Sequence, residues 1–188
     1  MDIKKVKSKL EKNKLINKIL YLKEVNSTQI FAKNNRKDIE SGTIILTENQ
    51  TAGIGTHGRV WESENGKNLT FTIVLNQNKK INELEYITLQ LAECIIKVIK
   101  QIYNTNADIK IPNDIIINNK KVAGILTETK IEGECVTELY IGIGLNINQK
   151  LFTKELENIA TSLLNETNKY VGKEEIFIKL ISEIEKII

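Results

Sequence analysis

The chain has 188 residues, of which 41% are hydrophobic, and a formal net charge of +3. This length and apolar content suit one globular domain, residues 1–188, and exclude a disordered chain. No apolar run is long enough for a signal peptide or a membrane span, so we expect a soluble, cytoplasmic protein that contacts no membrane. Lysine is mixed with glutamate along the chain, and this pattern argues against nucleic-acid binding.

The N-terminal half predicts strands and helices in alternation. Strands are expected at residues 17–25, 43–48 and 68–75, which alternate or run apolar and contain many β-branched side chains. Residues 27–40 begin with hydroxyl residues that suit a helix cap, so a short helix is expected there. Apolar residues recur at helical spacing over residues 82–103, which predicts a long helix facing the core.

The C-terminal half returns to strands before it ends in helices. Residues 108–129 read as three strands separated by a Pro-Asn-Asp turn and by an Asn-Asn turn at 118–119, because asparagine tolerates the positive φ of a tight hairpin. Another strand is expected at residues 134–148, and amphipathic helices at 153–166 and 173–188. The predicted class is α+β, with helices packed against a mixed sheet.

The two cysteines, Cys94 and Cys135, lie in segments with apolar periodicity. They lack metal-ligand spacing, and the chain has only one histidine. We therefore expect buried, reduced thiols, and neither a disulfide nor a zinc site.

The segment "TENQTAGIGTHGRVW", residues 47–61, gathers three glycines with the only histidine and the only tryptophan of the chain. Gly53, Gly55 and Gly58 follow a predicted strand, so the backbone can approach a ligand closely and close over it as a lid. The loop lacks the Gly-Lys-Ser/Thr ending of a P-loop, and the strand that follows it excludes a dinucleotide fingerprint. The alternative is a surface loop whose glycines only serve turns.

Two further glycine-bearing strands suggest a ligand. In "KKVAGIL", Lys121 enters an apolar strand beside Gly124, and a half-buried lysine is costly unless it meets an anion. The alternative is an exposed hairpin end formed with Lys120. In "YIGIGLNIN", Gly142 and Gly144 weaken a strand unless a ligand or another backbone approaches them, a β-bulge being the alternative.

Taken together, the motifs "EVNSTQIFAK", "TENQTAGIGTHGRVW", "KIPNDIIINNKKVAGILTET" and "IGIGLNIN" resemble the catalytic domain of biotin protein ligases (biotin–[acetyl-CoA-carboxylase] ligases) in order and spacing. The resemblance runs from about residue 20 to the end of the chain. The family signature is reproduced by Pro112, Asn113, Asp114, Lys121, Gly124, Ile125 and Leu126. It implies the biotin/lipoate ligase fold, a mixed, largely antiparallel sheet flanked by helices and similar to class II aminoacyl-tRNA synthetases.

The resemblance also implies an activity. Such enzymes activate the biotin carboxylate with ATP and Mg²⁺ to biotinyl-5′-AMP and release pyrophosphate. They then pass biotin to one lysine of a biotin carboxyl carrier protein or domain, of the acetyl-CoA or pyruvate carboxylase type. Bringing a carboxylate against a phosphate requires fixed positive charge and backbone N–H groups aimed at both anions.

The resemblance assigns roles residue by residue. Lys121 and Arg59 are expected to act in catalysis, Asp114 to help hold Mg²⁺, and Trp61 to pack on the adenine. The implied biotin-binding residues are Ser27, Thr28, Gln29, Gln50, Gly53, Gly55, Thr56, His57, Lys121, Gly124, Gly142 and Gly144. The implied nucleotide-binding residues are Arg59, Trp61, Asn113, Lys121 and Asn146.

The sequence departs from the family pattern at four positions. Ile54 and Thr56 replace the first two arginines of the loop, and a lost charged hydrogen bond costs about 1.5–3 kcal/mol. We therefore expect an enzyme that releases some of its biotinyl-AMP. Ile111 stands where the family has tryptophan and Gln29 where it has asparagine, so the biotin pocket is expected to differ slightly in shape.

Other readings remain open. A lipoate or octanoate ligase or transferase shares the fold, although a polar cluster of Ser27, Thr28 and Gln50 does not suit an aliphatic chain. A non-catalytic biotin-binding protein is the other alternative. We expect no DNA-binding winged helix before residue 17 and no SH3-like barrel after residue 188, and a homodimer formed through sheet edges is possible.

Overall fold

A seven-stranded sheet forms the centre of the computed structural model, which describes residues 1–188. Its order is β1-β2-β3-β7-β6-β5-β4. The strands are β1 (Lys18–Val25), β2 (Thr43–Gln50), β3 (Leu69–Lys80), β4 (Asp108–Lys110), β5 (Asp114–Ile117), β6 (Lys120–Glu132) and β7 (Cys135–Leu145). Only β1 and β2 pair in parallel, and all other neighbours are antiparallel. The predicted α+β class with a largely antiparallel sheet is confirmed.

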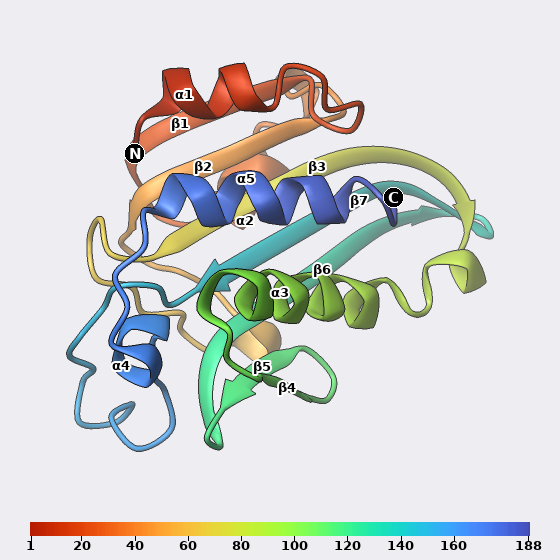
Figure 1. The fold of residues 1–188 in the computed structure, drawn as a ribbon. Coiled ribbons are helices and arrows are strands. Elements are labelled where there is room, and N and C mark those ends of the chain that lie inside the picture. Colours follow the sequence, from red (N-terminus) through yellow and green to blue (C-terminus); the bar gives the residue numbers. More distant parts are fainter.

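Helices cover both faces of this sheet. The α-helices are α1 (Ile3–Lys9), α2 (Thr28–Asn34), α3 (Ile87–Tyr103), α4 (Leu163–Thr167) and α5 (Lys173–Ile184). Short 3-10 turns lie at Arg36–Asp38, Thr56–Gly58 and Ile81–Leu84. Helices α3 and α5 lie side by side over one face, with α1 beyond α5, and α2 lies behind the sheet (Figure 1). No helix combines the length and apolar character needed to cross a membrane.

The main core lies between the sheet and the layer of α1, α3 and α5. Alternate residues of β3 point into it, and the rings of Phe71 and Phe177 meet edge-to-face with centroids 5.2 Å apart. Burying such a side chain contributes about 1.5–3 kcal/mol. A smaller cluster that includes Ala32 of α2 packs on the opposite face. Because side chains alternate along a strand, Thr70 and Thr72 point away from the main core, toward the α2 face.

The sheet register places the strand glycines beside these threonines. Thr72 pairs with Gly142, and Thr70 pairs with Gly144. Across β7, Gly144 in turn pairs with Gly124 of β6. Three neighbouring strands therefore present small or hydroxyl residues on one face, and they leave room above the sheet.

One predicted helix is wrong. Residues 153–166 are not a single helix, because residues 154–159 form turns and only α4 is α-helical. The backbone of Lys121 donates to Ile159 O at 2.8 Å, and Thr161 N donates to Lys121 O at 2.9 Å. These bonds hold the segment in an extended bridge to β6, which overrides its helical periodicity. Helix α1, capped by the side chain of Asp2, was not predicted at all.

The predicted Asn-Asn hairpin turn is confirmed. Asn118 and Asn119 adopt φ values of 49° and 62°, as the predicted hairpin turn requires, and the Ile111–Pro112 peptide bond before β5 is cis. Cys94 is a buried free thiol, and burial raises its pKa to about 11. The expectation that Cys135 is buried is wrong: it starts β7 beside the exposed β6–β7 turn, where it is half-buried.

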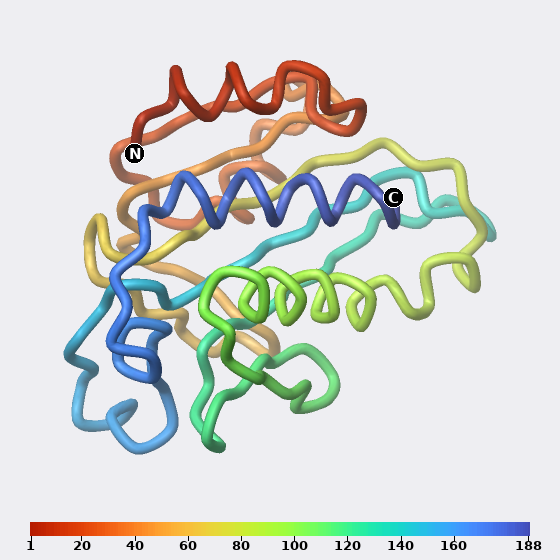
Figure 2. The backbone as a smooth tube through the Cα atoms, viewed as in Figure 1, coloured from red at the N-terminus to blue at the C-terminus, as the bar shows by residue number.

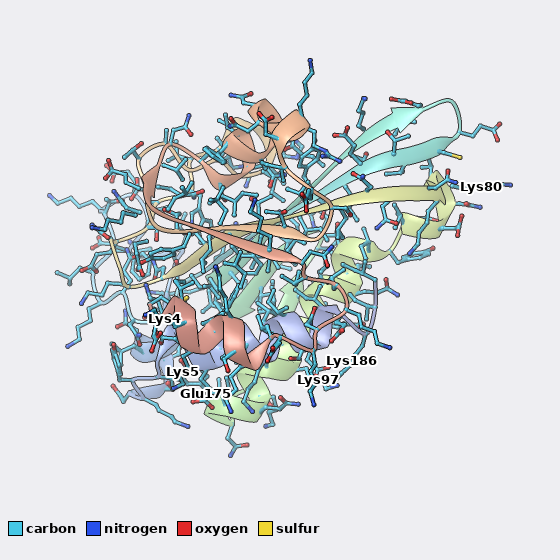
Figure 3. All side chains as sticks on the ribbon, turned by 90° about the horizontal axis from the view of Figure 1, so that it is seen from above. Lys4, Lys5, Lys80, Lys97, Glu175 and Lys186 are labelled. Carbon is cyan, nitrogen blue, oxygen red and sulfur yellow. The ribbon has the colours of Figure 1, made fainter.

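The two termini lie on the helix layer. The backbone trace begins beside α1 and ends after α5 (Figure 2). Figure 3 shows Lys4, Lys5, Lys97 and Lys186 on this layer, whereas Lys80 lies at the far end of β3. These lysines therefore lie apart from the glycine-bearing face described above.

Candidate functional site

A pocket lies on the α2 face of the sheet, with about 430 Å³ of space when the part open to solvent is counted. Strands β3, β6 and β7 form its floor, α2 closes one end, and the loop after β2 covers it. The predicted site residues that line it are Ser27, Thr28, Gln29, Gln50, Gly55, Thr56, Trp61, Asn113, Lys121, Gly124, Gly142 and Gly144. Segments far apart in the sequence thus meet in one cavity.

One end of the pocket is a buried network of hydroxyl and amide groups. The side-chain oxygen of Gln50 accepts hydrogen bonds from Thr28 N at 2.8 Å and from Thr28 Oγ1 at 3.1 Å. Thr72 Oγ1 lies 2.9 Å from Thr28 Oγ1 and 3.0 Å from Gln29 Oε1. Ser27 caps α2 by accepting from Ile30 N, which fixes the start of the helix over this end. The network can bind a ligand head that both donates and accepts hydrogen bonds.

Lys121 provides the positive charge of the pocket. Its backbone is held on both sides by the 159–161 segment, and its ammonium lies 2.6 Å from the Asp114 carboxylate. A side chain at Gly124 would place its Cβ 3.0 Å from Lys121 Nζ, so the lysine lies directly across this glycine. The side chain is half-buried, at 32% exposure, and it can still meet an anion that enters the pocket.

Trp61 packs on the floor of the pocket. A Cβ on Gly144 would come within 2.3 Å of the indole, which therefore lies in direct contact with the backbone of β7. The Lys121 ammonium lies 5.4 Å from the indole ring, within the range of a cation–π contact. The indole Nε1 is buried and has no hydrogen-bond partner. A buried donor without a partner can be satisfied by a ligand acceptor.

The covering loop has a defined geometry. Ile54 bridges Val60, and Trp61 N donates to Gly53 O at 2.9 Å, so the ends of the loop are pinned together. Gly53 is buried beneath this contact, where a Cβ would come within 2.4 Å of Trp61 O. His57, at the tip, has a φ of 57°. These features describe a lid with a fixed base and an exposed tip.

Five predicted site residues lie outside the pocket lining. Gly53 lies under the base of the lid, and His57 and Arg59 are exposed on its outer side. Asp114 contacts the pocket only through Lys121. Asn146 is buried, its Nδ2 donates to Thr161 O at 3.0 Å, and its Oδ1 has no partner.

The residues around Asp114 do not form a metal site by themselves. The structure contains no group of three or more histidine, cysteine or acidic residues able to hold a metal ion. The one carboxylate at this place already faces an ammonium, and the amide of Asn113 donates to Ile125 O at 2.8 Å. A cation could be held here only with most of its ligands supplied by a bound molecule.

Several lining residues were missed by sequence reasoning. They are Ile54, Thr70, Phe71, Thr72, Ile125, Leu126 and Ile143. Thr70 and Thr72 look like ordinary strand residues, and only their register opposite Gly144 and Gly142 places them in the pocket. The alternation of β3 was the one signal that could have found them, because it puts both threonines on the face of the glycines.

The chain is similar to known proteins in both sequence and fold. Residues 21–146 match the biotin/lipoate A/B protein ligase family. The bifunctional ligase/repressor BirA of Bacillus spizizenii is 35% identical over 161 residues, which are 82% of this chain and 49% of that protein. The biotin–[acetyl-CoA-carboxylase] ligase of Paracoccus denitrificans is 30% identical, over 86% of this chain and 68% of that protein.

A solved structure also resembles the chain over most of its length. The biotin protein ligase from Aquifex aeolicus in complex with biotin and ATP superposes with a TM-score of 0.78 and 30% identity, over 92% of this chain and 70% of that one. The present chain spans about half the length of the Bacillus relative. The matched segment covers most of the sheet, α2, the lid and the pocket, and the chain therefore belongs to the biotin/lipoate A/B protein ligase family.

Proposed function

We propose that the chain is the catalytic domain of an ATP-dependent biotin protein ligase, residues 1–188. It activates biotin to biotinyl-5′-AMP, and the biotinyl group then passes to a lysine of a carrier protein. One observation carries the proposal: a single pocket joins the polar network of buried Thr28, Gln29 and Thr72 with half-buried Gln50 to the ammonium of Lys121. The network suits the cyclic urea of biotin, and the ammonium suits its carboxylate.

The first chemical step forms a mixed anhydride. A carboxylate oxygen of biotin attacks the α-phosphorus of ATP, and the bond to the leaving pyrophosphate breaks. Both reactants are anions, so their approach depends on a fixed positive charge. Lys121 is held by two backbone hydrogen bonds and faces the pocket, so it can exchange its contact with Asp114 for the carboxylate and the α-phosphate.

In the second step the amine of the acceptor lysine attacks the acyl carbon. AMP leaves, an amide forms, and the amine loses one proton. The lid is expected to shield the adenylate from water until the acceptor arrives. Within this scheme Trp61 Nε1, which is buried without a partner in the pocket lining, offers the nucleotide one donor.

The cofactor is ATP, with biotin as substrate, and the Aquifex relative was solved with both molecules. We propose that Asp114 would be the protein carboxylate available to a Mg²⁺ ion bound with the nucleotide, and such an ion would need most of its other ligands from outside the chain. The metal would neutralise phosphate charge. Lys121 remains the positive charge that the chain itself supplies.

The proposed partner is a biotin carboxyl carrier protein. The Paracoccus relative is named for acetyl-CoA carboxylase, and we infer the same class of acceptor here, in the cytoplasm. A homodimer is a further proposal, since β1 and β4 end the sheet with no strand beyond them. Light scattering of the purified chain at several concentrations would distinguish a dimer from a monomer.

The lid favours partial release of the intermediate. Ile54 and Thr56 line the pocket where the family resemblance places arginines, and Arg59 lies outside the lining. Fewer charged contacts hold the adenylate, so it is expected to escape and acylate other proteins. Biotin labelling of a bystander protein at dilute enzyme is the expected result, and labelling restricted to the carrier would contradict it.

The test of the proposed function is biotin-dependent exchange of labelled pyrophosphate into ATP. The Lys121→Ala variant is expected to lower the exchange rate at least a hundredfold, since it removes a charged contact worth about 3 kcal/mol in the transition state. Lys130→Ala is the matched control, because Lys130 lies on the same strand but is exposed and pairs with Glu132. Equal rates in Lys121→Ala and wild type would contradict the proposal.

The same assay separates the alternatives. Exchange that depends on lipoate or octanoate and not on biotin would identify another acyl ligase of this family. Biotin binding by calorimetry without any exchange would identify a non-catalytic biotin-binding protein. The polar network favours biotin over both aliphatic acids, because an aliphatic chain offers no partner for the donors and lone pairs that the network's internal hydrogen bonds leave free.

A further inference from the structure

Gln29 joins α2 to β6 through its side-chain amide. The residue is 2% exposed. Its Nε2 donates to Glu128 Oε2 at 2.9 Å, and its Oε1 accepts from Thr72 Oγ1 at 3.0 Å. Glutamine is one methylene longer than the asparagine that the family pattern predicts here, and this length lets the amide reach across Gly142 to Glu128.

Glu128 determines which end of this amide faces the pocket. An amide nitrogen only donates and a carboxylate only accepts, so Nε2 must face Glu128. If the amide were reversed, Gln29 Oε1 would face the carboxylate and two acceptors would meet. The second carboxylate oxygen of Glu128 is held by Lys33 Nζ at 2.9 Å, which helps to keep the carboxylate in place. Glu128 itself does not line the pocket.

The fixed orientation leaves an acceptor inside the pocket. A Cβ on Gly142 would lie 2.8 Å from Gln29 Oε1, and both Gly142 and Thr72 line the cavity. The oxygen therefore lies at the polar end of the cavity. We propose that Glu128 is a positioning residue that presents Gln29 Oε1 as the acceptor for a urea N–H of biotin; this inference rests on the proposed function.

The inference explains selectivity among acyl ligands. A cyclic urea offers N–H donors, whereas the acyl chains of lipoate and octanoate offer none. Gln29 Oε1 has two lone pairs, and Thr72 satisfies only one of them. An aliphatic chain leaves the second without a donor, and the loss of one buried hydrogen bond to a neutral group costs about tenfold or more in affinity. Glu128 thus contributes to specificity without contacting the ligand.

The first test is the Glu128→Gln variant, which keeps the shape of the side chain. A glutamine at 128 can face Gln29 with either its oxygen or its nitrogen, so the Gln29 amide is then oriented only by the Thr72 hydroxyl and by the long 3.5 Å contact of Nε2 with Leu126 O. Calorimetry is expected to show the Kd for biotin rise about tenfold, which corresponds to one neutral hydrogen bond. The Kd for desthiobiotin, which keeps the urea but lacks the thioether, is expected to rise by the same factor. The Kd for octanoate, the KM for ATP and kcat should not change.

Two further variants distinguish positioning from damage to the fold. Lys33→Met removes the outer contact of Glu128 but leaves its contact with Gln29, so it is expected to change the Kd for biotin less than about threefold. The double variant Glu128→Gln with Gln29→Glu restores a donor–acceptor pair and again leaves only an acceptor in the pocket. It is expected to bind biotin more tightly than Glu128→Gln alone, a rescue that a purely structural role does not predict.

Several results would overturn the inference. One is a Kd for biotin within twofold of wild type in Glu128→Gln, while wild type still catalyses biotin-dependent exchange; the proposed function would then stand without the inference. Equal weakening of biotin and octanoate would show a general loss of structure. A wild-type chain that binds neither biotin nor desthiobiotin would remove both proposals. If Glu128→Gln does not fold, Glu128→Asp withdraws the carboxylate by one methylene and carries the same expectation.

Discussion

Among the glycines that line the pocket, Gly144 has the closest neighbour. The indole of Trp61 lies so close to its backbone that any side chain would collide with it. The backbone of Trp61 also fixes the base of the lid, because Trp61 N donates to Gly53 O. A single glycine in β7 therefore determines whether the lid can close in the form described.

We expect Gly144→Ala to displace the indole and disturb the lid. The added methyl would stand 2.3 Å from Trp61, and such overpacking costs about 1–3 kcal/mol. Chemical denaturation should report the loss of stability, and calorimetry a weaker affinity for biotin. Gly172→Ala is the control, because its nearest neighbour is a flexible carboxylate 3.2 Å away. Equal stability of both variants would show that Trp61 moves aside without cost.

Thr72 belongs to the polar network and lies on the strand beneath it. Its hydroxyl is fully buried and lies within hydrogen-bond distance of Thr28 and Gln29. Thr72→Val keeps the shape but leaves two buried groups without this partner, which costs about 1–3 kcal/mol. We expect the Kd for biotin to rise about tenfold or more, measured by calorimetry. Thr137→Val, on an exposed part of β7, should bind biotin as wild type does.

The motifs identify residues whose chemistry is unusual for their place. Lys121 in an apolar strand and glycines within strands stand out in the sequence, and all of them line one pocket. Thr72 and Glu128 do not stand out, because a threonine and a glutamate are ordinary in a strand. Their roles depend on which residue lies opposite across the sheet, and this information is absent from local sequence.

At the scale of elements, the 159–161 segment shows how tertiary contacts override local preference. Residues 153–166 carry helical periodicity, yet their backbone is drawn to Lys121 and pairs with it on both sides. Most other helices and strands were predicted within a few residues, since the apolar period of each agrees with its final packing. The periodicity of residues 153–166 could not reveal that this segment would pair with Lys121, the second residue of β6.

This segment holds Lys121, the proposed catalytic lysine, so its role can be tested as well. Thr161→Pro removes the N–H that donates to Lys121 O, whereas Thr161→Val keeps that N–H and loses only the side-chain bond to Glu166. We expect the proline variant to lower pyrophosphate exchange at least tenfold below the valine variant, because Lys121 loses its alignment. Similar rates in the two variants would show that the bridge does not position Lys121.

At the scale of the whole molecule, Glu48 joins the sheet to the helix layer. Its carboxylate pairs with Lys173 of α5, accepts from Tyr21 of β1 at 2.6 Å and from the Met1 amino group at 2.8 Å. Burial alone would raise its pKa, but these donors outweigh burial and lower the pKa from near 4.5 to about 2. The group is therefore more acidic in the folded than in the unfolded chain.

The Glu48 carboxylate makes the stability of the fold depend on pH. A carboxylate with a depressed folded-state pKa stabilises the fold above pH 4.5, and the contribution is lost as the pH falls toward 2. The shift corresponds to about 3 kcal/mol at most. Urea unfolding of Glu48→Gln should show a loss of up to this size at pH 7 and a flatter profile below pH 4.5. Glu132→Gln, at an exposed pair, should match wild type.

The position of Trp61 has a practical consequence for following the reaction. It is the only tryptophan of the chain, and it lies on the pocket floor with the Lys121 ammonium 5.4 Å from its ring. Its ultraviolet emission therefore comes from the pocket alone, without a dye and without background from a second indole. A ligand that draws the ammonium away, or that supplies an acceptor to Nε1, changes this emission. Rapid mixing with biotin and then with ATP should resolve each binding step as a separate optical signal in the unmodified protein.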